Sequence, residues 1–419
     1  MLRLEGGRVV CPITGTDTLA DVVVDGDRIA AVGNPPVSAE EEVIDCRGAI
    51  VCPGFVDLFT DFGDPGTTWR EGIEHGSLVA AAGGYTTVVV SPATSPIVDN
   101  PSVVSEIVMR AREVTGSRVQ VAGALTKSLD GIDLSEIGLM VDAGCVALSD
   151  GGRVIDDARV LRRALQYVAP YGRPIFLRPG DNSLESRGVM HEGAVSIRVG
   201  LRGISAAAEE IGVGRAIALC RITGVAVHLS QITLATSVRM IAAAMEEGIK
   251  ITASVPARSL LLTDEHIATS GYETSARLLP PLRPMSDVSA LRAAVQTFLS
   301  VTSDHTPWTR VEKELEFAYA LPGAIGLETA AGATWRIMGG NATGFVQAMS
   351  VRPGQVIGLR PTISPGACGD LTIFDPTVSW HGRDASLSRG CNEPLRNEAL
   401  LGRVAGTVVA GKMVYRLNG

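Results

Sequence analysis

The first question is what the acidic residues beside several short apolar runs could do. Asp61, Asp150 and Asp304 each follow such a run, and Arg178 follows another. Converging carboxylates could serve as general acid and base, or they could form a structural salt bridge with a cation. A guanidinium stays protonated and cannot act as a base. We therefore favour the salt bridge, with the Arg178 guanidinium facing Asp61, Asp304 or both.

Metal and nucleophile chemistry have weaker support in the residues. A hydrolytic metal centre needs several converging imidazoles or carboxylates. Of the six histidines, only His228 and His305 fall near predicted strand ends, and neither has a second histidine at ligand spacing. We interpret both as hydrogen-bonded structural histidines. The sequence has no GxSxG motif, and the Ser-Asp pairs at 149–150 and 303–304 would point to opposite faces of a strand.

Eight apolar runs separated by helical patterns position these residues. Runs that are apolar throughout indicate strands buried on both faces, as in a parallel sheet. Eight strand–helix units favour a closed (β/α)8 TIM barrel over an open doubly wound sheet, and no nucleotide-binding glycine motif is present. The predicted strands are Phe55–Phe59, Thr86–Val90, Val119–Ala124, Cys145–Ser149, Pro174–Leu177, Val225–Leu229, Ile249–Ser254 and Leu299–Ser303. Helical patterns between them include Asp156–Tyr167 and Ala235–Glu247.

The C-terminal ends of these strands form the candidate site. In a (β/α)8 barrel the chemistry lies on this face, whatever the reaction. The residues expected there are Asp61, Gly63, Asp64, Ala93, Asp150, Gly151, Arg178, Asp181, His228, Gln231, Arg258, Asp304 and His305.

Both ends of the chain have the pattern of β-structure outside the barrel. The apolar runs Val22–Val24 and Ile29–Val32 flank an Asp-Gly turn, and residues 404–415 predict a second hairpin around Gly411. We predict a small β-sandwich domain built from residues 1–50 and 355–419, next to a barrel of residues 51–354.

Composition excludes several classes of protein. Hydrophobic residues make up 46% of the chain and charged residues 20%, so a large core can be buried. The net charge of −8 argues against a nucleic-acid surface. There is no signal-peptide pattern, no apolar run of membrane-spanning length, and no CxxC pair among seven scattered cysteines. We expect a cytoplasmic protein that binds neither nucleic acid nor a membrane.

Ten motifs spread along the chain form a family pattern. They are Pro53–Leu58, Asp64–Gly66, Ala81–Val88, Gly188–Gly193, Ala206–Glu210, Leu261–Glu265, Pro280–Arg283, Ser303–Pro307, Gly326–Thr329 and Asp370–Pro376. Together they resemble the dihydroorotases of the amidohydrolase superfamily, over essentially the whole chain. The resemblance implies a TIM barrel of the amidohydrolase type. It also implies a zinc-dependent hydrolase of pyrimidine biosynthesis that interconverts carbamoyl aspartate and dihydroorotate.

The zinc positions of that family hold other residues in this sequence. Five metal ligands are replaced: two histidines after the first strand by Phe59 and Asp61, the aspartate next to Asp150 by Gly151, and the histidines after strands five and six by Arg178 and Gln231. The resemblance therefore implies a chain without bound zinc, and we expect no other cofactor.

Substrate contacts of the family are also lost. Its arginine after strand one is Gly63, its asparagine after strand two is Ala93, its asparagine before Pro280 is Leu279, and the histidine that closes its DHAPH run is Trp308. Asp304, the metal-bound general base of the family, survives beside His305. We expect the Phe59 and Trp308 side chains to fill the former pocket with apolar bulk.

These replacements lead to three hypotheses. The first is a catalytically inactive dihydroorotase homologue, a pseudoenzyme that acts as a structural or regulatory partner of aspartate transcarbamoylase, as such homologues do in the family; self-association is also open. The second is a metal-independent or mononuclear hydrolase of another cyclic amide, using Asp304, Asp150 and His228. The third is an active dihydroorotase. We favour the first, because without the metal ligands nothing lowers the pKa of a bound water.

Overall fold

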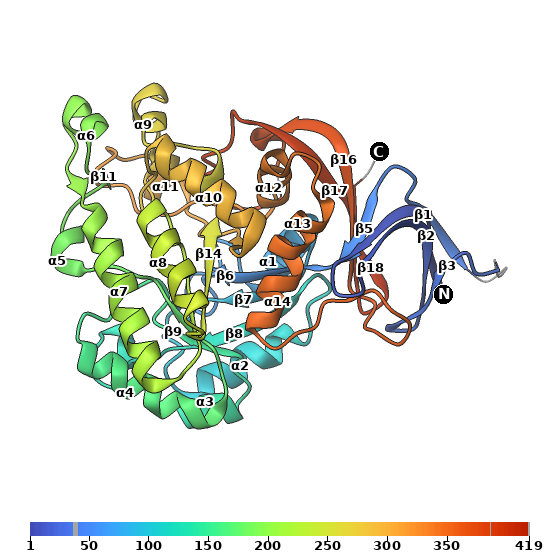
Figure 1. Ribbon diagram of the computed structural model, residues 1–419, viewed down its shortest axis with the longest axis horizontal. Coiled ribbons are helices and arrows are strands. Elements are labelled where there is room, and N and C mark those ends of the chain that lie inside the picture. The colour runs from blue at the N-terminus through green and yellow to red at the C-terminus, as the bar shows by residue number, and fades with distance from the viewer. Residues whose placement is uncertain (37–40, 386, 418–419) are drawn as a thin grey trace.

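Eight parallel strands form a nearly closed barrel in the middle of the chain. The structure is a computed structural model that describes residues 1–36, 41–385 and 387–417 (Figure 1). The barrel strands follow chain order, and the first and last meet at an isolated bridge between Thr60 and His305. They are β6 Phe55–Thr60, β7 Tyr85–Val90, β8 Arg118–Gly123, β9 Ala147–Ser149, β10 Ile175–Leu177, β13 Val227–Leu229, β14 Ile251–Pro256 and β15 Ser300–Thr302. All eight predicted strands are thereby confirmed, with small shifts at their ends.

Helices connect the strands and cover the barrel. In α4, the residues buried against the core recur at helical spacing (Val160, Leu161, Ala164, Leu165), and Asp157 caps the first turn by accepting from the Arg159 amide. The helices are α1 Ile73–Ala82, α2 Pro101–Ala111, α3 Ile137–Asp142, α4 Ala158–Val168, α5 Asn182–Glu185, α6 Ala194–Val199, α7 Ala206–Thr223, α8 Ala235–Glu246, α9 Glu265–Thr269, α10 Met285–Thr297, α11 Arg310–Lys313, α12 Ala330–Met338, α13 Ala342–Val346 and α14 Arg352–Val356. The predicted helical patterns correspond to α4 and α8. Among the described residues, no helix combines the length and apolar character that crossing a membrane requires.

Strands from both ends of the chain share one further sheet. Its members are β1 Leu2–Cys11, β2 Thr16–Asp25, β3 Arg28–Gly33, β4 Glu42–Asp45, β5 Ile50–Pro53, β16 Leu371–His381, β17 Ala399–Val409 and β18 Lys412–Arg416. Antiparallel pairing of β5 with β16 joins the two ends, and the predicted hairpins are the β2–β3 and β17–β18 pairs. The sandwich arrangement and the domain bounds stay predictions. Two short strands, β11 Met190–His191 and β12 Gly203–Ile204, pair apart from both sheets.

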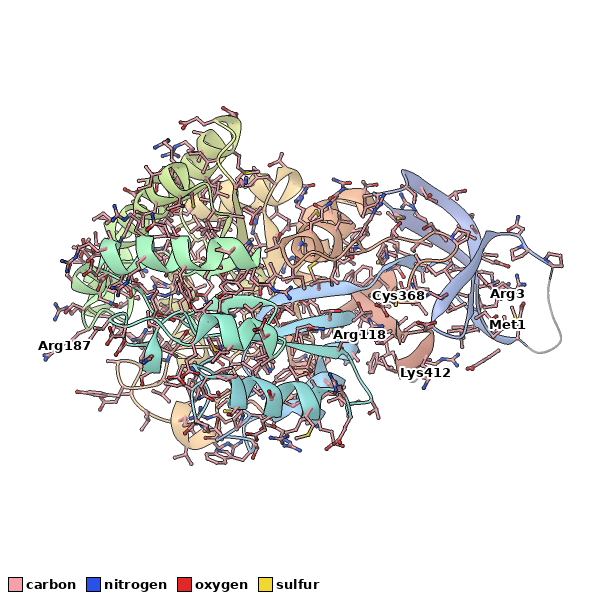
Figure 2. All side chains as sticks on the ribbon, turned by 90° about the horizontal axis from the view of Figure 1, so that it is seen from below. Met1, Arg3, Arg118, Arg187, Cys368 and Lys412 are labelled. Atoms are coloured by element: carbon pink, nitrogen blue, oxygen red, sulfur yellow. The ribbon has the colours of Figure 1, made fainter. Side chains whose placement is uncertain are left out.

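The terminal sheet is fastened to the barrel by a polar junction at the start of β8. The Arg118 guanidinium donates to the Asp370 carboxylate and, at 3.4 Å, to Cys368 Sγ, just before β16 (Figure 2). Inside the barrel, Val56, Leu58, Val89, Ala122, Ala147 and Phe176 form a small core, against which Val356 and Ile357 pack from the end of α14. Side chains therefore fill the inside of the barrel, and the end of α14 packs against that filling.

Candidate functional site

Asp304 is held at the C-terminal end of the barrel by two neighbouring strand ends. It follows β15, whereas Gln231 follows β13 and Arg258 lies in the 3-10 turn after β14. Arg258 Nη2 donates to Asp304 Oδ2 and Gln231 Nε2 donates to Oδ1, so both carboxylate oxygens accept from protein groups. Arg258 Nη1 also donates to the Asp304 backbone carbonyl at 3.1 Å. The pair is buried, with the two side chains 5% and 3% exposed.

The backbone at Gln231 and at Asp304 is strained. Gln231 and Asp304 both lie in the left-handed region, with φ of 60° and 48°. A residue with a Cβ reaches this region at a cost of about 1–2 kcal/mol. Strained backbone of this kind clusters where a site needs a fixed side-chain direction. Here it directs the Gln231 amide and the Asp304 carboxylate toward each other.

The electrostatics of Asp304 follow from burial and from its partners. Burial raises the pKa of the Asp304 carboxyl above its ordinary value, and the Arg258 charge and the Gln231 amide oppose that rise. A guanidinium in direct contact with the carboxylate favours its ionised form. The arrangement is a buried ion pair with a neutral amide on the second oxygen.

The prediction that Arg178 neutralises Asp304 or Asp61 is wrong. Its Nη1 and Nη2 donate to the two carboxylate oxygens of Glu185, at 2.6 and 2.9 Å, and its Nε donates to the Gly152 carbonyl. Glu185 lies in α5, seven residues further along the chain. This fork-to-fork pair uses the guanidinium's geometry locally, so Arg258 is the cation that contacts Asp304.

The three aspartates accept hydrogen bonds from different groups. Asp61 Oδ1 accepts from the Gly63 amide at 2.8 Å, which closes a local turn. Asp150 accepts from the amides of Leu125 and Thr126, both at 2.9 Å, and from the Thr126 hydroxyl. Burial raises the pKa of both carboxyls. The predicted salt bridge of these carboxylates with Arg178 is therefore wrong, because each carboxylate accepts from other groups and Arg178 pairs with Glu185.

Two glycines at the site hold backbone conformations that oppose the family's side chains. Gly63 has φ of +62°, and an added Cβ would lie 2.3 Å from Thr67 Oγ1. Gly151 has φ of +59°, and an added Cβ would lie 3.0 Å from Ala93 Cβ. Both φ values disfavour any residue with a Cβ. An arginine at position 63 would also clash with Thr67, whereas an aspartate at position 151 would carry backbone strain of the kind seen at Gln231 and Asp304 and press against Ala93.

The aromatic replacements lie at the rim of the site and are partly exposed, as is Leu279. The Trp308 Nε1 donates to the Pro322 carbonyl at 2.9 Å, and the Arg70 guanidinium lies 4.2 Å from the centroid of its ring. The Phe59 ring reaches toward Gly152, where an added Cβ would lie 3.9 Å from Phe59 Cζ. Filling of the former pocket by these two rings stays a prediction.

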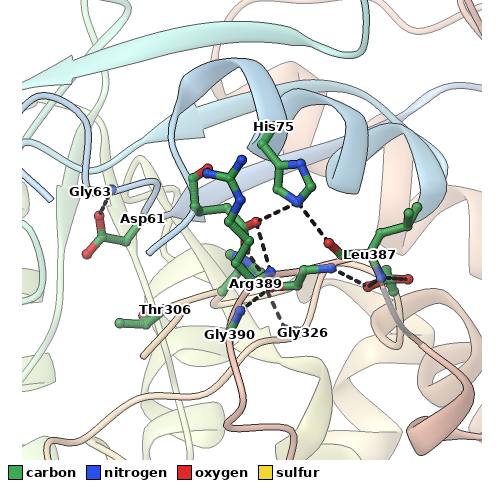
Figure 3. A network of polar contacts seen from close by, with 12 residues as sticks. Asp61, Gly63, His75, Thr306, Gly326, Leu387, Arg389 and Gly390 are labelled. Carbon is green, nitrogen blue, oxygen red and sulfur yellow. Dashed lines mark hydrogen bonds and ion pairs between the residues drawn. The ribbon is translucent and has the colours of Figure 1, made fainter. Parts of the chain in front are cut away.

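His305 joins a buried network that links the first strand–helix loop to the C-terminal segment. Its Nδ1 accepts from the Gly326 amide at 3.3 Å, so its Nε2 carries the proton and donates to Glu71 at 3.1 Å. Glu71 also accepts from the Ser388 hydroxyl and the Arg389 amide, and His75 lies 3.3 Å away (Figure 3). Both nitrogens of His305 are hydrogen-bonded, as its structural interpretation predicts. Sequence reasoning missed Glu71, because its partners come from distant segments.

We expect Glu71→Gln to destabilise the protein by about 2 kcal/mol at pH 7, the scale of hydrogen bonds to a charged group. Burial raises the pKa of Glu71, but hydrogen bonds from His305 and Ser388 outweigh it and hold the pKa below 4.5. The wild-type advantage is thus complete above pH 4.5 and shrinks as the pH falls through the folded-state pKa. Urea unfolding at pH 7 and pH 4 measures it. The matched control is Glu74→Gln, exposed in the first turn of α1 three residues later, and equal losses in both variants would contradict the network.

Sequence comparison relates this chain to dihydroorotases. A family model described as Dihydro-orotase-like matches residues 48–237. The dihydroorotase of Pelotomaculum thermopropionicum is 40% identical over 424 residues, covering 99% of this chain and 98% of that protein. The dihydroorotase of Anaeromyxobacter dehalogenans is 37% identical over 423 residues, with coverage of 99% and 98%. The chain belongs to the dihydroorotase family.

Two solved structures share the fold of this member of the dihydroorotase family. The L-hydantoinase of Arthrobacter aurescens has a TM-score of 0.85 at 21% identity, covering 100% of this chain and 96% of that chain. The dihydropyrimidinase of Brevibacillus agri has a TM-score of 0.84 at 21% identity, with coverage of 99% and 95%. The barrel with its accompanying sheet is therefore the shared architecture.

The residues at the dihydroorotase zinc positions do not fit zinc. Zinc in proteins takes about four nitrogen, sulfur or carboxylate ligands. Both oxygens of Asp304 already accept from Arg258 and Gln231, and the neighbouring positions offer a guanidinium and a carboxamide. Over the part of the chain that the structure describes, no three His, Cys, Asp or Glu side chains are grouped to hold a metal ion. The donor set of this family member therefore suits an ion pair instead.

The residues named for hydrolysis of another cyclic amide are not brought together. His228 lies within β13, with Nδ1 at 3.0 Å from the Thr252 hydroxyl and Nε2 at 3.0 Å from the Ser254 hydroxyl. Asp150 is bound to the loop after β8, and Asp304 to Arg258. His228 is a hydrogen-bonded core histidine, as its structural interpretation predicts.

Proposed function

We propose that this member of the dihydroorotase family is catalytically inactive and acts in pyrimidine biosynthesis as a structural or regulatory partner of aspartate transcarbamoylase. The observation that carries the proposal is the Arg258 guanidinium on Asp304, the family's general-base position. Hydrolysis of a cyclic amide at neutral pH needs an activated water, and a metal supplies it by lowering the water's pKa to about 7. A guanidinium has no acceptor and binds no water as a ligand, so it replaces the metal's charge but not its chemistry.

Retention of the scaffold supports a role other than this reaction. The chain keeps about the full length of its dihydroorotase relatives, 98% of the Pelotomaculum protein, together with the eight-stranded barrel. The partner comes from the resemblance to non-catalytic family members that hold aspartate transcarbamoylase in a larger assembly. Such a partner needs the folded scaffold but not the catalytic residues.

An exposed apolar surface at the rim supports a protein partner. We call it the rim surface: Trp69, Val311, Leu315 and Tyr319, which are 61%, 83%, 49% and 73% exposed. The ion pair between Arg70 and Glu312 places the Trp69 segment beside α11, and Leu315 and Tyr319 follow α11 closely in the chain. Large exposed apolar side chains that gather in this way are typical of interaction sites.

We expect the purified chain to bind less than about 0.1 zinc per chain and to leave dihydroorotate unchanged, because its donor set lacks the ligands that catalytic zinc needs. Elemental analysis and an absorbance assay of dihydroorotate measure both quantities. Zinc near one or two equivalents together with turnover would contradict inactivity. The same assay with hydantoin and dihydropyrimidines tests hydrolysis of another cyclic amide.

Partnership is tested by co-expression with the aspartate transcarbamoylase of the same organism and size-exclusion chromatography. We expect the two chains to elute together, and the chain alone to report its own oligomeric state. The double variant Val311→Asp with Tyr319→Asp should abolish co-elution. Its control is Ile222→Asp, a 67% exposed position on α7 away from the rim surface. Independent elution of the wild-type chains would refute the partnership.

A further inference from the structure

A cavity of about 680 Å³ opens at the end of the barrel opposite Asp304. Its walls come from the starts of β13, β14 and β15, and from the π-helical turn Gln347–Val351 and α14, which close that end of the barrel (Figure 1). The volume lies within the range of about 300–1,000 Å³ that small-molecule sites occupy. The opposite end of the barrel therefore has room for a ligand that the family's chemistry does not use.

The charge of the cavity is positive. Lys250 and Arg352 line it, and none of the described lining residues is Asp or Glu, although the whole chain carries a net charge of −8. Arg352 Nη1 donates to the carbonyls of Val295 and Leu299, at 2.7 and 2.8 Å. Within the described residues, no acceptor binds its Nε or Nη2. The guanidinium is thus fixed by the end of α10 while N–H donors remain for a ligand.

The remaining wall is mainly apolar. Met245, Phe298 and Thr252 line it, and the Thr252 hydroxyl contacts His228 Nδ1 at 3.0 Å. Thr252 is exposed although it belongs to a barrel strand, so the cavity reaches between the strand ends. Apolar walls with a few convergent polar groups are the usual composition of a small-molecule site. An inorganic anion would leave these walls without a partner.

We propose that this cavity binds a small organic anion, a carboxylate carried on a ring or branched apolar body. The carboxylate binds Arg352 and Lys250, and the body packs against Phe298 and Met245. A guanidinium whose position is already fixed binds a carboxylate with little further ordering. The site needs neither zinc nor the residues around Asp304, so it stands or falls independently of the proposed function.

The test compares benzoate, benzamide and inorganic phosphate by isothermal titration calorimetry on the full chain. Benzamide has the shape of benzoate without its charge, and phosphate has charge without the apolar body. We expect saturable binding of benzoate, and binding of benzamide and phosphate weaker by about tenfold or more, since a charge-assisted contact contributes on that scale. Equal binding of benzoate and benzamide, or no benzoate binding at millimolar concentration, would overturn the proposal.

Variants locate the binding. Lys250→Gln should weaken benzoate several-fold, and Lys412→Gln, the same change on the exposed β18 strand of the terminal sheet (Figure 2), should leave it unchanged. Thr252→Trp fills the part of the cavity beside His228 and should abolish binding. Met245→Trp, at a 37% exposed position, narrows the cavity without altering the barrel and serves if the Thr252 variant fails to fold. Undiminished affinity in folded Thr252→Trp or Met245→Trp would place benzoate elsewhere and overturn the proposal.

Discussion

Replacing Arg258 by leucine is expected to lower the free energy of unfolding by about 3–5 kcal/mol, the usual cost of leaving one member of a buried ion pair without its partner. The Asp304 carboxylate would keep only the Gln231 amide, at a site where its side chain is 3% exposed. Urea unfolding of the variant and the wild type at pH 8 measures the loss.

The double variant Arg258→Leu with Asp304→Leu separates the ion pair from simple packing. Removing both charges removes the desolvation penalty, so we expect it to recover most of the stability that the single variant loses. The control is Arg221→Leu, whose ion pair with Glu247 is about half exposed. Exposed pairs contribute about 0–1 kcal/mol, so this change should be small. A double variant as unstable as Arg258→Leu would contradict the pairing.

The pH dependence of the Arg258→Leu variant provides a second check. Burial already raises the folded-state pKa of Asp304 above the ordinary value of 3.8, and without the Arg258 guanidinium less opposes that rise, so the pKa increases further. A group with a raised folded-state pKa favours folding at low pH and opposes it as the pH rises. The deficit of the variant relative to the wild type should therefore be smaller at pH 5 than at pH 8. A deficit independent of pH would indicate that only packing was lost.

Acid is expected to destabilise the wild-type protein through His228. Complete burial lowers the pKa of this imidazole from 6.5 to about 3, and its neighbours are the Thr252 and Ser254 hydroxyls and the Phe176 ring. The unfolded chain binds a proton below pH 6.5 and the folded chain does not. The free energy of unfolding therefore does not depend on His228 protonation above pH 6.5. Through this imidazole it falls by up to about 1.4 kcal/mol per pH unit between pH 6.5 and 3.

The variant His228→Gln keeps hydrogen-bonding groups at this position but cannot titrate. Its stability should decline less steeply than that of the wild type between pH 6.5 and 4.5, as measured by urea unfolding at half-unit steps. His191, whose pKa burial and the Arg283 charge lower to about 4, contributes a similar slope that remains in the variant. His381→Gln, at the partly exposed end of β16, should leave the wild-type slope unchanged. Identical slopes in wild type and His228→Gln would show that this imidazole does not control the acid response.

The Arg258–Asp304 ion pair bears on both the stability of the protein and its proposed inactivity. In the family, a metal would neutralise the carboxylate and activate water. In this chain the guanidinium provides the positive charge, and the strained backbone at Gln231 and Asp304 holds the acceptor in place. A site altered in this way can remain folded without its metal, which is consistent with the retained barrel.

The sequence by itself determined the barrel, the sheet shared by the two ends and the missing zinc ligands. The eight apolar runs and the two hairpin turns are local patterns, and local patterns report burial on both faces and turn geometry directly. The positions at 59, 61, 151, 178 and 231 could likewise be compared with the family one residue at a time. No knowledge of neighbours in space was needed for either inference.

Only the tertiary structure decided which side chains meet. Arg178 and Arg258 both follow barrel strands, so position alone does not rank them as partners of Asp304. Glu185, at the end of α5, pairs with the Arg178 guanidinium, whereas the Arg258 guanidinium contacts the Asp304 carboxylate. Likewise, Glu71 and Ser388 lie 317 positions apart and meet only when the C-terminal segment crosses the barrel. The direction of a side chain and the contacts between distant segments depend on how the whole chain packs. Residue type and spacing along the chain do not by themselves reveal that packing.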